Sequence, residues 1–247
     1  MDKKYELTSD SISWTHNKKD HTLYRIRALR NFGKTKEGNL GGYIESENNL
    51  SHDGYAWVGS NAKVFDPARI YGNARVFDKA EVFGNARVYG DAWVYGSANI
   101  YDNVRIYDRA KIHGNSVIHG HASIFGDAEV YGDAWVYDNS RIFDNAEVYD
   151  DSWVAGNSEV FKDARVCNDA RVCGKVSMSP VCIKGLQLRV SIIDDLMTVD
   201  CYTFSLAKWD ALRPDDILNL PHRHLSEWWK KYKDFILGIA YESGRRW

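Results

Sequence analysis

Aliphatic residues recur at every sixth position through the middle of the chain. From Val58 to Val172 this position is always valine or isoleucine, which makes twenty consecutive six-residue units without an insertion. A typical unit is Val88-Tyr89-Gly90-Asp91-Ala92-Trp93. Position two is usually aromatic, positions three and four are usually Gly, Asp or Asn, and position five is usually Ala or Ser. Such self-similarity at a fixed period indicates a repeat architecture.

Each unit predicts one short strand followed by one corner. In the stretch Ala92-Trp93-Val94-Tyr95, alternation along a strand directs Ala92 and Val94 to one side and Trp93 and Tyr95 to the other. Gly, Asp and Asn tolerate left-handed backbone angles and can turn the corner. Three strands per turn make each coil three units long, with Val, Ile, Ala and Ser inside. The fold class predicted is therefore an all-β solenoid, a triangular parallel β-helix of about seven coils.

The two flanks lack the repeat and predict caps. Residues 12–14 and 22–29 alternate as half-buried strands do, and a polar turn at 16–20 joins them into a hairpin. We expect residues 1–39 to form an N-terminal cap over the first coil, residues 40–183 the β-helix, and residues 184–247 a small α/β domain. A cap is expected because the open end of a repeat array exposes unpaired strand edges.

The predicted C-terminal domain begins with a second hairpin, in which residues 186–193 and 196–204 are joined at Asp194-Asp195. Two helices should follow. A short one opens at Asp215, and a longer one is capped by Ser226. Apolar residues from Trp228 through Phe235 to Ile239 recur at helical spacing and predict one buried face. The final residues 244–247 are expected to be frayed.

The six-residue units resemble the hexapeptide repeat of the left-handed parallel β-helix family. The resemblance covers the whole repeat region, and residues 23–29 with 41–46 look similar to bacterial and bacteriophage hexapeptide-repeat proteins that carry the label acyltransferase or polymer-forming protein. The family implies left-handed coils and homotrimers. Its catalytic members imply a histidine general base, an inserted loop between coils, and an acyl-CoA groove between subunits.

Bulk composition excludes several function classes. The 247 residues are 44% hydrophobic and carry a formal net charge of -2, so no global basic field indicates nucleic-acid binding. The four cysteines lack metal-ligand spacing. Corner aspartates form turns without a metal, and the nonapeptide calcium pattern is missing, so we expect no metal. The chain has neither an apolar leader nor a membrane-length apolar run, and we expect a cytoplasmic protein that does not contact membranes.

Residues three units apart should stack, so the outward columns can be listed. Candidate binding residues lie in these columns: Arg69, Arg87, Arg105 and Arg141, beside Tyr71, Tyr89 and Tyr107, and on the other two faces Trp93, Trp135 and Trp153. Two compatible interpretations are open. The rings can stabilise the solenoid by stacking, or they can form an interface, which for the resembled family would be that of a homotrimer.

The Arg and Tyr columns together are the best candidate surface for an anionic or nucleotide partner, because basic residues interleaved with aromatic rings suit phosphate contact and base stacking. The conservative alternative, preferred from the sequence alone, pairs these arginines with corner acids such as Asp66, Asp102 and Asp138 or with the C-terminal segment.

Three histidines lie within the repeat. His113 and His119 replace the usual aromatic residue at position two, on different faces, and His121 falls at a corner. A general base must reach the proton that it removes, and no inserted loop interrupts the twenty units. We therefore interpret these histidines first as tolerated substitutions in an aromatic column. If the chain is an enzyme, the catalytic candidates are His119 and His121, followed by His113.

The leading hypothesis is a non-enzymatic binding or scaffold protein, trimeric and without a cofactor, that presents aromatic and arginine ladders to a protein or anionic partner. If the chain is phage-encoded, a role against a host system follows from the resemblance. The alternative is an acyltransferase that uses acetyl-CoA. A polymer-forming role is disfavoured by the two predicted caps.

Overall fold

The computed structural model describes residues 3–16, 18–167, 170–172, 175–176, 181–183, 188, 190–199, 202–213, 216–217 and 224–247. The chain forms two compact units, Met1–Lys175 and Val176–Trp247.

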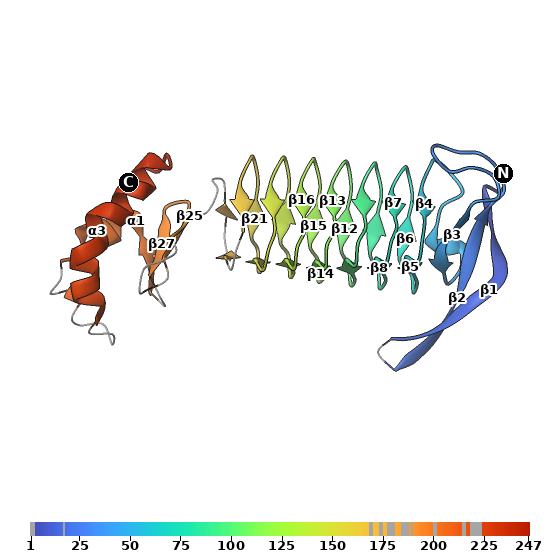
Figure 1. Cartoon of the computed structure of the whole chain (residues 1–247), viewed down its shortest axis with the longest axis horizontal. Coiled ribbons are helices and arrows are strands. Elements are labelled where there is room, and N and C mark those ends of the chain that lie inside the picture. Colours follow the sequence, from blue (N-terminus) through green and yellow to red (C-terminus); the bar gives the residue numbers. More distant parts are fainter. Residues whose placement is uncertain are drawn as a thin grey trace. The chain divides into compact units, whose positions relative to one another are not determined.

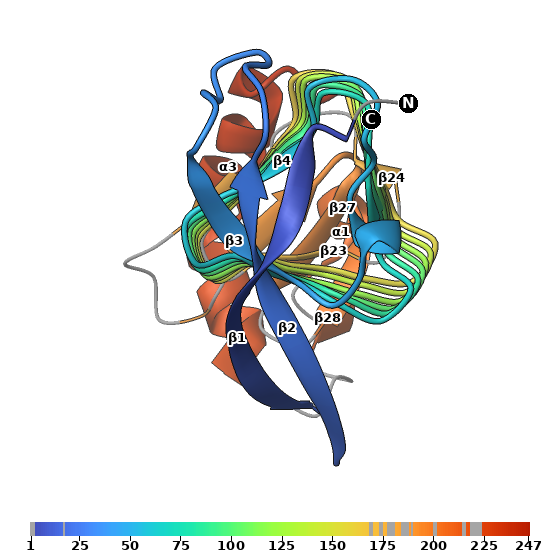
Figure 2. The ribbon, with the colours of Figure 1, turned by 90° about the vertical axis from the view of Figure 1, so that its right-hand side faces the viewer.

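The first unit is a β-solenoid of about seven coils, as the six-residue period predicts (Figure 1). Viewed along the stack, the coils superimpose and enclose a narrow interior (Figure 2). Within the repeat, each strand from Trp57–Val58 to Trp153–Val154 pairs in parallel with the strand three units later, for example Arg87 with Arg105 and Val88 with Ile106. Three parallel sheets, here called sheets I, II and III, therefore run the length of the solenoid.

Sheet I contains β3 (Leu40–Ile44), β5 (Lys63–Val64), β8 (Glu81–Val82), β11 (Asn99–Ile100), β14 (Val117–Ile118), β17 (Trp135–Val136), β20 (Trp153–Val154) and β23 (Arg171–Val172). Sheet II contains β4 (Trp57–Val58), β7 (Arg75–Val76), β10 (Trp93–Val94), β13 (Lys111–Ile112), β16 (Glu129–Val130), β19 (Glu147–Val148) and β22 (Arg165–Val166). Sheet III contains β6 (Arg69–Ile70), β9 (Arg87–Val88), β12 (Arg105–Ile106), β15 (Ser123–Ile124), β18 (Arg141–Ile142), β21 (Glu159–Val160) and β24 (Lys175–Val176).

The interior is filled by positions one and five of the units. The valines and isoleucines at position one are at most 1% exposed, and the alanines at position five are similarly buried. Ser140 and Ser158 also point inward, and Ser140 Oγ donates a hydrogen bond to the Tyr137 carbonyl at 2.6 Å. The alternation of side chains along each strand therefore separates a dry core from the outward columns.

Position three makes the corners. Every residue at this position from Ser60 to Lys162 has a φ between 52° and 73°, which explains the preference for Gly and Asp. At five of these corners an Asp carboxylate accepts a hydrogen bond from the backbone N–H one coil further on, as Asp138 does from Gly156 at 3.1 Å and Asp144 does from Lys162 at 3.0 Å. These aspartates thus link one coil to the next.

The N-terminal hairpin consists of β1 (Tyr5–His16) and β2 (Lys19–Ala28), both longer than the alternation predicts. It extends sheet I at its first edge in the order β1-β2-β3-β5, with β2 antiparallel to β3. A 3-10 turn, η1 (Glu47–Asn49), follows β3. Leu23 of β2 packs with Tyr43, Phe65 and Phe83, so the hairpin covers the start of one aromatic column as well as the sheet edge.

The second unit is built on an antiparallel sheet in the order β25-β26-β27-β28, made of β25 (Val181–Ile183), β26 (Val190–Ile193), β27 (Leu196–Val199) and β28 (Tyr202–Ser205). The predicted strand at 196–204 was wrong in extent, because the chain forms two paired strands there. Helices α1 (Leu206–Ala211) and α3 (His224–Glu242) pack on this sheet through Trp209 and Trp229. Among the described residues, no helix is long and apolar enough to cross a membrane.

Three details of the second unit correct the sequence interpretation. Helix α3 begins at His224, so Ser226 lies in its first turn and is buried there. Phe235 is 56% exposed, because the buried face passes through Trp229 and Ile236. The C-terminal segment is docked: Arg245 is buried, and its Nε donates to the Asp194 carbonyl at 2.7 Å. The predicted start of the short helix, Asp215, lies outside the described residues.

Candidate functional site: a basic column beside a tyrosine ladder

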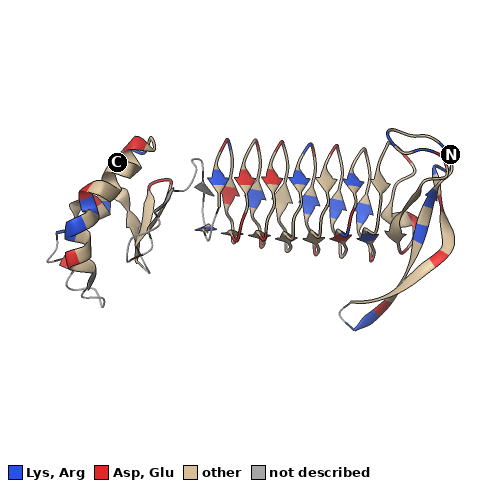
Figure 3. Ribbon diagram, viewed as in Figure 1, with Lys and Arg blue, Asp and Glu red and all other residues tan. Residues whose placement is uncertain are grey.

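Arginines form an uninterrupted outward column on the first strands of sheet III. Arg69, Arg87 and Arg105 are partners in register on β6, β9 and β12, and all three side chains are exposed. Figure 3 shows these basic strands next to one another, followed by the uncharged β15. None of the three forms an ion pair with any residue that the structure describes. The column therefore presents three guanidinium groups that lack a carboxylate partner within the described chain.

Tyrosines run parallel to the arginines on the same strands. The Tyr71 and Tyr89 rings stack at 4.8 Å and 3°, and the Tyr89 and Tyr107 rings stack at 5.0 Å and 6°. Phe125 covers the far face of Tyr107 at 4.9 Å. Partial burial raises the pKa of Tyr89 and of Tyr107, so both phenols remain protonated at neutral pH and can donate hydrogen bonds. We call Arg69, Arg87, Arg105, Tyr71, Tyr89 and Tyr107 the Arg–Tyr surface.

The stacking changes what the tyrosines can bind. Both faces of the Tyr89 and Tyr107 rings are covered by neighbouring rings, so these tyrosines present only their edges and hydroxyl groups. Base recognition on an aromatic platform needs an open ring face. The sequence-based idea that these rings stack nucleobases therefore fails for Tyr89 and Tyr107, whereas phosphate or carboxylate contact with the arginines is unaffected.

The corner acids do not neutralise this column. Asp66 bonds to Lys19 at 2.9 Å, Asp102 lies 3.8 Å from His119, and Asp138 accepts from the Gly156 backbone. The conservative pairing of the arginines with these three aspartates is therefore wrong. Arg141 on β18 differs from the other arginines, since it pairs with Glu159 at 3.1 Å and lies over the Phe143 ring.

The three candidate tryptophans lie on other sheets. Trp93 on sheet II is 37% exposed and packs edge-on against Phe77 at 5.8 Å. Trp135 and Trp153 on sheet I stack on each other at 5.6 Å, and Arg171 lies 5.0 Å from the Trp153 ring. The structure thus distributes the predicted binding residues over three faces and brings only the Arg–Tyr surface together.

The histidines are members of ring columns. His113 stacks between Tyr95 and Tyr131 on sheet II, and its Nε2 lies 2.9 Å from Glu129 Oε1. His119 stacks between Tyr101 and Tyr137 on sheet I. His121 is exposed at a corner. The structure does not gather the three histidines into one site.

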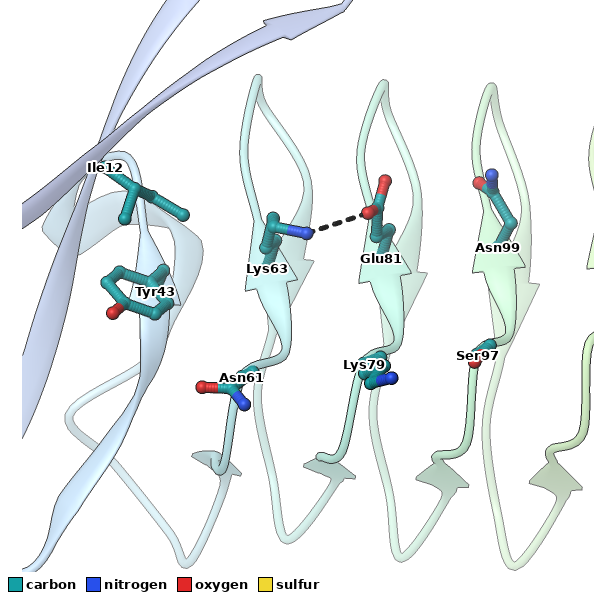
Figure 4. A pocket seen from close by; sticks show the side chains of 8 residues that line it. All are labelled: Ile12, Tyr43, Asn61, Lys63, Lys79, Glu81, Ser97 and Asn99. Carbon is teal, nitrogen blue, oxygen red and sulfur yellow. Dashed lines mark hydrogen bonds and ion pairs between the residues drawn. The ribbon is translucent and has the colours of Figure 1, made fainter.

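A polar groove beneath the hairpin was not found from the sequence. It has a volume of about 560 Å³ and opens between β1 and the first rungs of sheet I (Figure 4). Its lining residues are Ile12, Tyr43, Asn61, Lys63, Lys79, Glu81, Ser97 and Asn99. The repeat pattern does not predict this groove. One wall belongs to the hairpin, and no periodic pattern in the sequence indicates where the hairpin lies over the coils.

One cluster has the donor set of a cation site. His21 on β2, Glu45 and Asp66 offer three ligand atoms within 4.8 Å of one another. Each is already engaged, because His21 Nδ1 lies 3.0 Å from Glu45, Glu45 accepts from the Asp66 backbone at 2.7 Å, and Lys19 Nζ bonds to Asp66. This network links the hairpin to the first coil without an added ion.

Comparison with known families supports the solenoid. Residues 68–82 and 80–96 match the model of a family described as YdcK Beta solenoid repeat. The matched segments include β6 to β10 and contain Arg69, Arg87, Tyr71 and Tyr89 of the Arg–Tyr surface. No curated protein matches the chain. The comparison therefore supports a β-solenoid repeat and carries no information on activity.

Proposed function

We propose that this protein is a non-enzymatic binding protein whose Arg–Tyr surface binds a macromolecular polyanion. One observation carries the proposal: Arg69, Arg87 and Arg105 lie exposed in register without an ion-pair partner among the described residues. Like charges on adjacent strands repel one another, so an external anion that neutralises the column relieves this repulsion.

The surface suits recognition by charge. Its guanidinium groups are donors only, and the protonated phenols beside them add further donors. No carboxylate pairs with the three guanidinium groups within the described chain, and the inner ring faces are covered. A partner rich in regularly spaced acceptors, such as phosphate, sulfate or carboxylate groups, therefore fits better than one recognised through its bases.

The test is binding of fluorescent polyanions to the full chain and to Arg87→Gln/Arg105→Gln. Heparin and single-stranded poly(U) are the probes, and Lys111→Gln/Lys230→Gln removes the same charge from other surfaces. We expect the first double variant to bind at least tenfold more weakly than the control. Equal binding by the two double variants would refute the proposal.

Self-association is a second part of the proposal. The exposed Trp93, Trp135 and Trp153 and the resemblance to trimeric hexapeptide-repeat proteins support a homotrimer. Light scattering of the wild type and of Trp135→Ala/Trp153→Ala tests it, and we expect the variant to dissociate at concentrations where the wild type is trimeric. A monomeric wild type would contradict it. If the chain is phage-encoded, the polyanion belongs to a host system.

An acyl-CoA-dependent acyltransferase is the alternative function. The observation in its favour is the contact of His113 with Glu129, because a carboxylate can orient an imidazole that acts as general base. Acetyl-CoA should then raise the melting temperature of the wild type, and His113→Asn should lose any acetyl transfer. Absence of a shift with both acetyl-CoA and CoA would remove this alternative.

A further inference from the structure

The groove beneath the hairpin contains polar side chains that have no hydrogen-bond partner among the described residues. Asn61, Lys79 and Ser97 occupy position four of three successive coils, and none of their side chains makes a hydrogen bond within the described residues. Further along this column the pattern changes, since Asn115 Nδ2 donates to Asp133 Oδ1 at 2.9 Å. The first three side chains of this column therefore line the groove with polar groups that are free to bind a ligand.

A second column forms the floor. Lys63 Nζ pairs with Glu81 Oε1 at 2.9 Å (Figure 4). Lys63 Nζ also lies 3.7 Å from the centroid of the Trp14 ring of the hairpin. The other carboxylate oxygen of Glu81 makes no hydrogen bond among the described residues. Ile12 and Tyr43 add an apolar wall on the hairpin side.

We propose that this groove binds a saccharide that carries a carboxylate. The site offers acceptors, Glu81 and the amide oxygen of Asn61, together with donors on Lys63 and Asn61. A ligand that fits must therefore both donate and accept hydrogen bonds, as sugar hydroxyl groups do. A sulfate ion only accepts, and would place its oxygens against the Glu81 carboxylate.

Lys79 supplies the anchor for the acidic group. It is exposed, lies between Asn61 and Ser97 in the column, and forms no ion pair with any described residue. Since Lys63 and Glu81 neutralise each other, Lys79 leaves the groove with one net positive charge. The volume lies within the range of roughly 300–1,000 Å³ for small-molecule pockets and suits about one or two sugar rings.

Titration of the full chain with cellobiuronic acid and with neutral cellobiose tests the inference by calorimetry and by NMR of the asparagine side-chain amides. We expect the acidic disaccharide to bind at least tenfold more tightly than the neutral one. Lys79→Met should abolish this difference, and Glu81→Gln should weaken both sugars. Lys111→Met, an exposed lysine on sheet II, is the matched control and should bind like the wild type.

The outcomes separate this site from the Arg–Tyr surface, which lies on another sheet. Failure of both disaccharides to bind at millimolar concentration, or full binding by Lys79→Met, would overturn the inference. Equal binding by cellobiuronic acid and by a glutamate-rich peptide would also overturn it, because the groove would then recognise any carboxylate. Far-UV circular dichroism confirms that each variant folds. Arg87→Gln/Arg105→Gln should leave sugar binding intact.

Discussion

The residue at position three of each unit determines how much backbone strain a corner of the solenoid carries. Position three needs a left-handed backbone, which Gly adopts without steric cost and Asp tolerates with help from its hydrogen bond to the next coil. Ser60 and Lys162 are the exceptions, with φ values of 52° and 58°, and Lys162 has the longer side chain. Strain at the described corners is therefore concentrated at these two residues.

Replacing Lys162 by glycine should stabilise the first unit. Lys162→Gly removes the Cβ clash of the left-handed conformation, and the backbone N–H that bonds to Asp144 is retained. After the entropic cost of glycine we expect a gain of about 0.5–1 kcal/mol in the free energy of unfolding. Urea denaturation measures it. Lys162→Ala controls for the lost charge and should bring no gain, so equal gains would show that backbone strain is not the cause.

The buried hydroxyl group of Tyr5 should also contribute measurably to the stability of the first unit. Its buried hydroxyl donates to the Leu50 carbonyl at 2.7 Å and lies 3.2 Å from the Glu47 carbonyl, and burial raises the pKa of the phenol. Tyr5→Phe should cost about 1–3 kcal/mol, since the Leu50 carbonyl loses this donor.

The loss of stability caused by Tyr5→Phe should depend on pH. Because the folded pKa of Tyr5 exceeds the unfolded value of 10.0, its contribution is complete below pH 10 and is lost as the pH rises above that value. The difference in melting temperature between the wild type and Tyr5→Phe should therefore narrow above pH 10. A difference that widens there would contradict this assignment.

At the scale of elements, the ring columns connect one coil to the next. Along sheet III, Tyr107 stacks on both Tyr89 and Phe125, whereas the only described ring that stacks on Tyr71 is that of Tyr89. Stacked aromatic pairs contribute about 0.5–1.5 kcal/mol each beyond the area that they bury. The columns thus stabilise a solenoid whose individual strands are only two residues long.

The number of ring neighbours predicts the cost of removal. Tyr107→Ala loses two stacked partners and Tyr71→Ala loses one, so Tyr107→Ala should destabilise the protein by about 0.5–1.5 kcal/mol more. Chemical denaturation of the two variants gives the comparison. If both cost the same, the rings act through local burial and the column does not link the coils.

The sequence predicts the repeating part of these elements and misses what depends on the flanks. The period of six fixes which side chains of β9 or β10 face inward, because alternation leaves one choice once Val and Ala are buried. It could not show that Tyr89 has no open ring face, since that depends on the distance between rings. Helix α1 was missed because Ser205, which accepts from the Lys208 N–H, begins it directly after a strand.

At the scale of the whole molecule, the chain comprises two units with separate cores, and the candidate sites lie in the first. The Arg–Tyr surface follows from the repeat, because the arginine recurs in every third unit from Arg69 to Arg105. The groove could not be predicted without the position of the hairpin. That position is set by the contact of Lys63 with the Trp14 ring and by the hydrogen-bond network around His21. Local periodicity does not encode such contacts between distant segments.

The central claim is that the arginine column binds a polyanion by charge. The most direct test is the salt dependence of binding to a mixed-sequence B-DNA duplex, used as a uniform polyanion. If each of Arg69, Arg87 and Arg105 neutralises one phosphate, the slope of log K against log salt should be about -2.7 for the wild type and about -0.9 for Arg87→Gln/Arg105→Gln. Equal slopes for the two proteins would contradict the claim.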